Sequence, residues 1–335
     1  MIDSPQRSPL AVTMGDPAGV GPELVLRAWL ARSSASPAFF VLADPAALAG
    51  LARRLDLAVP LAEATPAEAA AAFPRALPVA PLAARADAAP GAPSPAFAAA
   101  TIESIERAVG YVKSGAARAV VTNPIAKATL YAAGFKFPGH TEFLGALAKR
   151  DWGGAAQPVM MIWSEALAVV PITIHVALDD VPRMLTRDLI VSTARIVAAD
   201  MNSRFGVARP RLAFAGLNPH AGEGGAMGRE EIDTIAPAIE ALRGEGLDVV
   251  GPLPADTMFH AAARARYDVA LTMYHDQGLI PAKTLAFDSG VNVTLGLPFV
   301  RTSPDHGTAF DIAGQGVASP TSLIAALRLA ARLAP

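Results

Sequence analysis

The chain has 335 residues, enough for two domains or one large one, and it is 52% hydrophobic and 17% charged, which is a globular composition. Its net charge of −2 provides no overall field for nucleic acid or an anionic membrane, so anions must be recognised by local Lys, Arg and backbone amides. The absence of cysteine excludes disulfides, cysteine-ligated zinc, iron–sulfur clusters and thiol nucleophiles.

Targeting and membrane segments are not expected. The N-terminal residues lack the apolar core of a signal peptide. The longest apolar stretch begins at Pro158 but contains Ser164, Glu165 and a second proline, Pro171, so it is too short and too interrupted to span a bilayer. We therefore expect a soluble, cytoplasmic protein.

The first third of the chain predicts strands that alternate with helices. An apolar strand at 10–14 runs into a glycine-rich turn and then a helix at 23–31, with Pro22 in its first turn. The glycines of this turn do not have the Rossmann spacing, so no Rossmann domain is predicted. The turn can admit a ligand to the helix start or can be purely structural. The other elements expected here are strands at 39–44 and 77–82 and a helix at 97–113.

A further strand is predicted in ARAVVTNPIAK, and the carboxyl end of this strand carries Thr122, Asn123 and Lys127. In the segment FPGHTEF, Thr141 suits the N-cap of a helix with Glu142 in its first turn. A helix cap with no further role explains this segment equally well.

The centre of the chain also alternates, which favours a mostly parallel sheet covered by helices. The predicted strands are 169–175, 211–218, 247–251 and 268–274, and the predicted helices are 186–202, 230–243 and 256–266.

Three histidines, His175, His220 and His275, fall at or just after the carboxyl ends of predicted strands. Such ends converge in a parallel sheet, so these imidazoles can form a three-histidine metal site although they are far apart in sequence. Each histidine taken alone also fits a packed or hydrogen-bonded role. His260 lies inside a predicted helix and is assigned a structural role.

Polar side chains are densest in residues 273–316. We interpret this segment as two strands, each flanked by a polar loop, in the order strand, polar loop, strand, polar loop, and we expect it to form the wall of one cleft. A surface loop with solvated charges is the alternative. The chemically capable residues here are His275, Asp276, Lys283, Asn292, Arg301, Asp305 and His306.

Eight stretches of the sequence together are characteristic of one family: TMGDPAGVGPE at 13, TNPIAK at 122, FPGHTEF at 137, HVALDDVP at 175, GLNPHAGEGGAMGREE at 216, PADT at 254, MYHDQG at 273 and VNVTLGLPFVRTSPDHGTAFDIAG at 291. Through them nearly the whole chain, least in 45–100, resembles the 4-hydroxythreonine-4-phosphate dehydrogenase (PdxA) family. The last stretch also looks like the loop that binds the adenosine part of the coenzyme in isocitrate and isopropylmalate dehydrogenases.

This resemblance implies an α/β protein whose two domains have mostly parallel sheets around a central cleft. Residues 1–130 with 285–335 are expected to form the coenzyme-side domain, and 131–284 the metal, substrate and dimerisation domain. The implied reaction is the NAD(P)- and divalent-metal-dependent oxidation of 4-phosphooxy-L-threonine to a 2-amino-3-oxo acid. That acid decarboxylates to 3-amino-2-oxopropyl phosphate in pyridoxine 5′-phosphate biosynthesis.

The resemblance also implies roles for individual residues. The metal ligands are His175, His220 and His275, one of them supplied across the interface of a homodimer, and the metal is zinc, magnesium, cobalt or manganese. The substrate-binding residues are His140, Thr141, Lys283, Asn292 and Arg301. The coenzyme-binding residues are Asp305, His306, Gly307, Thr308 and Asp311. Lys283 and Asp256 are the candidates for the general base.

Three alternatives remain open. Asn123 and Ala126 depart from the TAPINK form associated with the family, and a paralogous D-threonate or D-erythronate 4-phosphate dehydrogenase would use the same metal and loops. A phosphotransacetylase-like acyltransferase shares the broad architecture but needs neither the histidines nor the coenzyme loop. A binding protein without catalysis would not need metal ligands.

Overall fold

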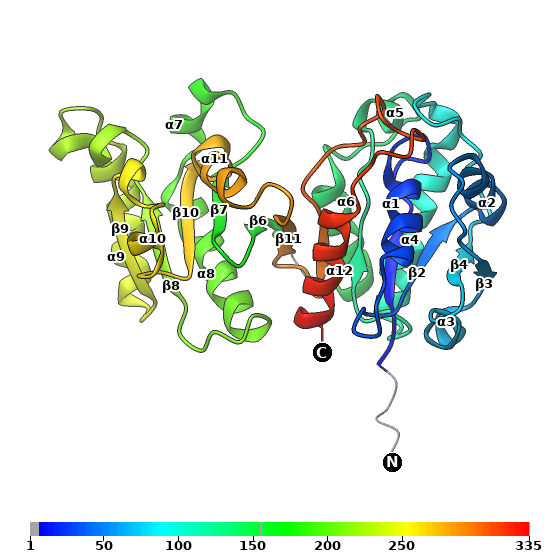
Figure 1. Ribbon diagram of the computed structural model, residues 1–335. Coiled ribbons are helices and arrows are strands. Elements are labelled where there is room, and N and C mark those ends of the chain that lie inside the picture. Colours follow the sequence, from blue (N-terminus) through cyan, green and yellow to red (C-terminus); the bar gives the residue numbers. More distant parts are fainter. Residues whose placement is uncertain (1–6, 155, 335) are drawn as a thin grey trace, which may run out of the picture. The chain divides into compact units, whose positions relative to one another are not determined.

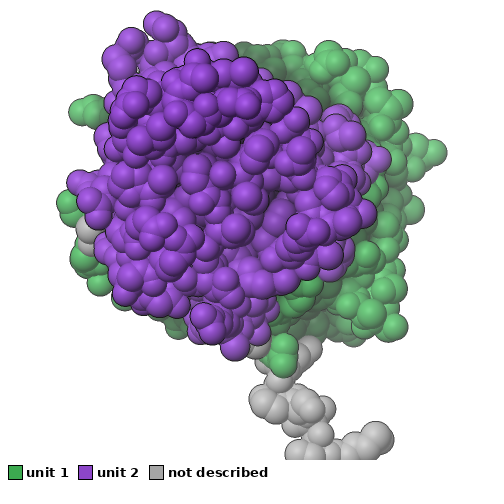
Figure 2. All heavy atoms as spheres, turned by 90° about the vertical axis from the view of Figure 1, so that its left-hand side faces the viewer, with its two compact units in different colours: residues 1–158, 297–335 green, residues 159–296 purple. Residues whose placement is uncertain are grey.

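The computed structural model describes residues 7–154 and 156–334 (Figure 1). The chain forms two compact units, Met1–Pro158 with Leu297–Pro335, and Val159–Gly296, which Figure 2 colours separately. The sequence placed domain boundaries after residues 130 and 284, whereas the units change after residues 158 and 296. Residues 131–158 lie with unit 1 because they pack in its core, and 285–296 lie with unit 2 because they contain one of its strands.

The strands of unit 1 form a fully parallel sheet. Their order is β3-β4-β2-β1-β5-β12. β1 is buried along its whole length and pairs with β2 on one side and β5 on the other, so it reads as a continuous apolar run. The strands are β1 Leu10–Thr13, β2 Phe39–Ala43, β3 Leu61–Glu63, β4 Leu77–Pro81, β5 Val120–Val121 and β12 Arg301–Pro304.

Proline and capping side chains start several helices of unit 1. Proline lies in the first turn of α1, α2 and α3, and the Asp44 carboxylate caps α2 by accepting from the backbone N–H groups of Ala46 and Ala47. The helices are α1 Gly21–Leu30, α2 Pro45–Arg54, α3 Pro66–Ala72, α4 Ala98–Lys113, α5 Lys127–Ala132, α6 His140–Trp152 and α12 Thr321–Leu333.

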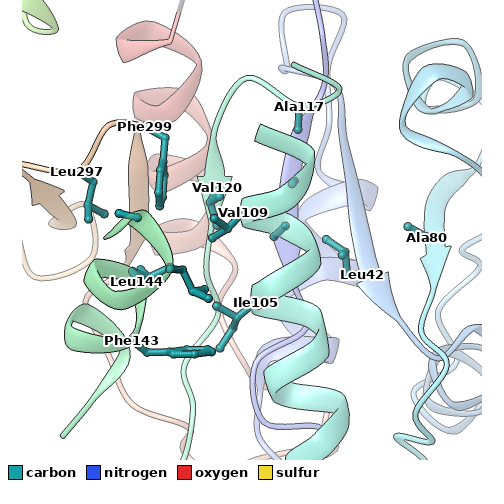
Figure 3. Packing of buried hydrophobic residues seen from close by; sticks show 14 of the residues in the cluster. Leu42, Ala80, Ile105, Val109, Ala117, Val120, Phe143, Leu144, Leu297 and Phe299 are labelled. Atoms are coloured by element: carbon teal, nitrogen blue, oxygen red, sulfur yellow. The ribbon is translucent and has the colours of Figure 1, made fainter. Parts of the chain in front are cut away.

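The direction of the crossovers decides which face each helix covers. The connections from β1 to β2 and from β4 to β5 run in opposite directions across the sheet, so right-handed crossovers place α1 and α4 on opposite faces. α6 packs against α4, and Figure 3 shows Phe143 and Leu144 of α6 beside Ile105 of α4 in one buried cluster.

Unit 2 has the strand order β11-β6-β7-β10-β8-β9. β6 is antiparallel to both β11 and β7, and the remaining pairs are parallel. Its strands are β6 Val159–Trp163, β7 Ala168–Thr173, β8 Arg211–Ala215, β9 Asp248–Leu253, β10 Val269–Tyr274 and β11 Val291–Leu295. Its α-helices are α7 Val181–Met184, α8 Arg187–Ser203, α9 Ala236–Gly244, α10 Ala261–Arg264 and α11 His275–Ala286.

The predicted α/β class with mostly parallel sheets is confirmed, but three local predictions are wrong. Residues 275–286 form α11 instead of a polar loop, with Pro281 inside the helix. The N-cap of α6 is Gly139, so Thr141 lies in the first turn. His260 is the N-cap of α10 and not an interior helical residue. Within the described ranges, no helix is both long and apolar enough to cross a bilayer.

Candidate functional site

The ends of two neighbouring strands of unit 2 bring His175 and His275 together. β7 and β10 are parallel, and Thr173 lies opposite Tyr274 at their carboxyl ends. The hydroxyl of Thr173 donates to the Met273 carbonyl at 2.7 Å and ties these ends to each other. As a result the imidazole centroids of His175 and His275 are 5.5 Å apart, with 42° between the ring planes.

The orientation of His275 is fixed by its neighbours in the first turn of α11. Its Nδ1 lies 2.7 Å from Asp276 Oδ1, a contact that leaves Nε2 as the ring atom for a ligand. Gln277 accepts from the Met273 N–H and donates to the Gly216 carbonyl, both at 2.7 Å, which joins the helix start to the ends of β10 and β8. A Cβ on Gly278 would lie 2.7 Å from Thr272 Oγ1, so only glycine allows this close approach.

His220 lies on a loop of left-handed backbone. His220, Ala221 and Glu223 all have positive φ, between 43° and 52°, which is uncommon outside glycine. The carboxylate of Glu231, 3% exposed, supports the loop by accepting from the backbone N–H of Asn218 at 2.7 Å and from its side-chain amide at 3.0 Å. A Cβ on Gly222 would lie 2.6 Å from this carboxylate. Glu231 is therefore a positioning residue that was not found from the sequence.

The donor chemistry of His175 and His275 fits a divalent metal, because imidazole nitrogens are common ligands of such ions. Two imidazoles from adjacent strand ends supply part of a site. In the part of the chain that the structure describes, no three His, Asp or Glu side chains of one chain form a group that could hold a metal ion. The set of three predicted ligands is therefore brought together only in part within one chain.

The other predicted residues of unit 2 lie on three elements. Lys283 is on α11, eight residues or about 2.2 turns after His275, so the two side chains leave the helix roughly 80° apart. Asn292 is on β11 opposite Ile162 of β6. Asp256 is exposed in a short 3₁₀ helix, Ala255–Thr257, after β9.

In unit 1 a buried arginine lies beside a histidine. Arg301 begins β12, is 4% exposed, and donates through Nε and Nη2 to Thr122 Oγ1 at 3.1 and 2.7 Å. Burial lowers the pKa of Arg301 to about 10, so its guanidinium stays charged at neutral pH. Burial, and then the charge of Arg301, lower the pKa of His140 well below its usual value. His140 is therefore neutral at pH 7.

His140 also opens helix α6. Its Nε2 is a buried atom and has no hydrogen-bond partner among the described residues, although the residue as a whole is partly exposed. No side chain caps α6, because Gly139 precedes it. A Cβ on Gly139 would lie 3.4 Å from Nζ of Lys127, which places a further cation near the first turn. His140, Thr141 and Lys127 thus lie around a helix start that favours anions.

The predicted coenzyme loop of unit 1 contacts the glycine-rich turn after β1. The Thr308 carbonyl accepts from the Val20 N–H at 2.9 Å, and Ala309 has a φ of 43°. His306, Gly307 and Asp311 are exposed, whereas Asp305 and Thr308 are partly buried.

Asn123 and Ala126, the two residues that depart from the TAPINK form, both make contacts that hold the backbone of unit 1 together. Asn123 is 1% exposed and donates from its amide to the Thr13 carbonyl at 2.8 Å. Ala126 donates its backbone N–H to the carboxylate of Asp16, whose pKa is raised mainly by burial. Both residues therefore hold the turn after β1 against the segment after β5.

The sequence prediction missed Lys127, Glu231 and Gln277 as parts of the site. A signal for Lys127 was present, because it follows the end of a predicted strand. Glu231 and Gln277 act through contacts with residues 13 and 61 positions away, which spacing does not reveal.

Comparison with known proteins identifies the family. Residues 35–330 match the family described as pyridoxal phosphate biosynthetic protein PdxA. A 4-hydroxythreonine-4-phosphate dehydrogenase of Methylorubrum extorquens is 64% identical over 97% of this chain and 94% of that relative. A crystal structure of the enzyme so named from Klebsiella pneumoniae covers 98% of this chain and 100% of its own, at 36% identity and a TM-score of 0.86. One from Burkholderia phymatum covers 98% of each chain, at 38% identity and a TM-score of 0.81. The chain therefore belongs to the PdxA family.

Proposed function

We propose that this protein is a 4-hydroxythreonine-4-phosphate dehydrogenase that oxidises 4-phosphooxy-L-threonine with NAD or NADP. The product would be a 2-amino-3-oxo acid that decarboxylates to 3-amino-2-oxopropyl phosphate, in pyridoxine 5′-phosphate biosynthesis. The observation that carries this proposal is the 64% identity, along almost the whole chain, to a relative of that name. The arrangement of polar groups in both units supports it.

The phosphate of the substrate is assigned to unit 1. The buried guanidinium of Arg301 provides a planar cation for it, and the helix start at His140 and Thr141 offers backbone N–H groups. Because His140 is neutral, its unpartnered Nε2 can exchange a hydrogen bond with the phosphate without adding charge. An anion here would also compensate the charge of Arg301, which burial opposes.

A divalent cation is assigned to His175, His220 and His275, with one of these ligands coming from the partner in a homodimer. A contribution from the partner is supported by two observations: the His175 and His275 rings lie 5.5 Å apart, and no three His, Asp or Glu side chains among the described residues of one chain form a metal-binding group. When bound, the cation would act as a Lewis acid that favours loss of the substrate hydroxyl proton and stabilises negative charge during decarboxylation. Asp276 would hold the His275 ring in the orientation that presents Nε2.

The oxidation transfers hydride from the substrate carbinol carbon to the nicotinamide and releases the hydroxyl proton to a base. Lys283 is our first candidate for this base because it lies on α11, the helix that begins with His275. Asp256 is the second candidate, and Asn292 is assigned to the substrate. The loop that contains Asp305, His306, Gly307, Thr308 and Asp311 is assigned to the coenzyme.

NADH appearance followed by absorbance tests the proposal, with added divalent metal and repeated after chelation. Turnover of 4-phosphooxy-L-threonine that the chelator abolishes is the expected result. Preference for D-threonate or D-erythronate 4-phosphate would keep the site but reassign the substrate. Failure to oxidise any of these substrates, together with acyl transfer to phosphate, would replace the proposal by the phosphotransacetylase-like alternative.

A further inference from the structure

One buried hydroxyl group in unit 1 holds the guanidinium of Arg301. Thr122 is 0% exposed, and its Oγ1 accepts from Nε of Arg301 at 3.1 Å and from Nη2 at 2.7 Å. Nε and Nη2 form one edge of the planar guanidinium, so two bonds to a single oxygen restrict both the position and the rotation of that plane. Because the donor is charged, these bonds are stronger than those between neutral groups.

The strand register shows why the side chain of Arg301 needs an anchor. Arg301 lies opposite Val120 in the parallel pair of β12 and β5, and the N–H of Thr122 continues this ladder by donating to the Thr302 carbonyl at 3.0 Å. Along an extended chain Thr122 lies about 7 Å beyond Val120, toward the carboxyl end of β5, and points to the same face. The long side chain of Arg301 therefore runs along the sheet, and Thr122 fixes where the guanidinium lies.

The backbone that carries Thr122 is held from two strands. Its own N–H is bonded to β12, and the next residue, Asn123, donates from its N–H to Thr13 Oγ1 at 3.2 Å and from its amide to the Thr13 carbonyl at 2.8 Å. Threonine is also β-branched, which restricts its χ1 angle. The hydroxyl is therefore a fixed point to which the more flexible arginine is attached.

The hydroxyl orients the guanidinium without offsetting its charge. A carboxylate in place of Thr122 would form an ion pair with Arg301, whereas a neutral oxygen leaves the positive charge for an anionic ligand. Burial, and then this charge, lower the pKa of His140, so the guanidinium acts at the start of α6. The same helix start offers backbone N–H groups to an anion.

We propose that Thr122 is a positioning residue of the phosphate site, whose hydroxyl orients Arg301 toward the phosphate of the substrate. Thr122 acts through Arg301 and does not touch the substrate itself, which agrees with its complete burial. This inference rests on the proposed function, since it takes Arg301 as the residue that binds the phosphate in that reaction.

Calorimetry with inorganic phosphate and initial rates of NADH formation from 4-phosphooxy-L-threonine test this role on the full chain. Thr122→Val removes the hydroxyl and nearly keeps the shape, whereas Thr122→Ser keeps the hydroxyl. Thr302→Val is the matched control, because Thr302 is also 0% exposed but its hydroxyl donates to the Ala326 carbonyl at 2.9 Å. We expect Thr122→Val to weaken phosphate binding and raise the KM about tenfold, with a smaller change in kcat. Thr122→Ser and Thr302→Val should stay within about twofold of the wild type.

A double-mutant cycle tests whether Thr122 acts through Arg301. On an Arg301→Met background, Thr122→Val should change kcat/KM by less than about twofold, because the group it orients is absent. Effects that multiply independently would overturn the inference.

The two proposals fail in different ways. If the wild type oxidises the substrate and Thr122→Val matches Thr302→Val in KM and phosphate affinity, Thr122 has no positioning role and the proposed dehydrogenase activity stands. If the wild type oxidises none of the candidate substrates but the variants differ in phosphate affinity as expected, Thr122 orients Arg301 in an anion site and the proposed function is wrong. Melting curves establish that each variant is folded, and Thr122→Ala replaces Thr122→Val in every measurement if the valine variant does not fold.

Discussion

Replacing Arg301 with Lys tests the assignment of the phosphate site. Arg301 is 4% exposed, and its fork makes two bonds to Thr122. Lysine keeps the positive charge but cannot offer two parallel donors in the same plane. Losing one hydrogen bond to a charged group costs about 1.5–3 kcal/mol. We therefore expect the KM for the phosphorylated substrate to rise by a factor of about 10–150, with a much smaller change in kcat.

The assay measures initial rates of NADH formation over a range of substrate concentrations for Arg301→Lys and for Arg118→Lys. Arg118 is a suitable control because burial also lowers its pKa, while its Nη1 donates to the carbonyls of Ala331 and Ala334. We expect the control to keep the wild-type KM. A KM within twofold of wild type in Arg301→Lys would show that this guanidinium does not bind the phosphate.

Three further predictions concern the metal loop, pH and the core. His220→Gly and His220→Ala should both lose metal binding in calorimetry. In urea unfolding the glycine variant should be about 1 kcal/mol more stable than the alanine variant, because the φ of 52° is strained for alanine. Equal stability of the two variants would show that the backbone at this position is not strained. Burial lowers the pKa of His140 in the folded chain. As the pH falls, the unfolded chain therefore takes up this proton before the folded chain does, and the free energy of unfolding should decrease below about pH 6.5. Thermal unfolding should therefore shift more between pH 7 and pH 5 in wild type than in His140→Gln, and parallel shifts would contradict this. Leu144→Ala should cost about 2–5 kcal/mol in equilibrium urea unfolding, because the side chain is fully buried, and a cost below about 1 kcal/mol would mean that the core repacks around it.

The strand ends that carry the candidate ligands could be predicted from the sequence because parallel strands read as apolar runs. Val269–Tyr274 is such a run, and His275 follows it directly. Ala168–Thr173 is another such run, and His175 follows it after Ile174. The apolar pattern thus shows that each histidine follows the end of a strand. The pairing of β7 with β10 then brings His175 and His275 together in space.

Helix α11 could not be predicted because its sequence contains the two residues that usually end helices. Gly278 is there because a Cβ would collide with Thr272, and Pro281 lies far enough into the helix to look like a break. The cap of α6 was missed for a related reason. Thr141 is the better capping residue by type, but the N-cap lies two residues earlier, at Gly139, where a Cβ would lie 3.0 Å from Glu142 Oε2 and 3.2 Å from Lys127 Cε.

The backbone of the predicted metal ligands explains why sequence patterns locate such a site only approximately. His175 and His220 both have a φ of 52°, a conformation that costs an ordinary residue about 1–2 kcal/mol. Such strain persists only where surrounding contacts over-determine the loop, and the buried carboxylate of Glu231 with Asn218 provides these contacts for His220. Local preference alone would place both histidines in ordinary conformations and point their rings elsewhere. The position of each imidazole therefore depends on contacts between residues distant in sequence, and a substitution at Glu231 can displace a ligand without touching it.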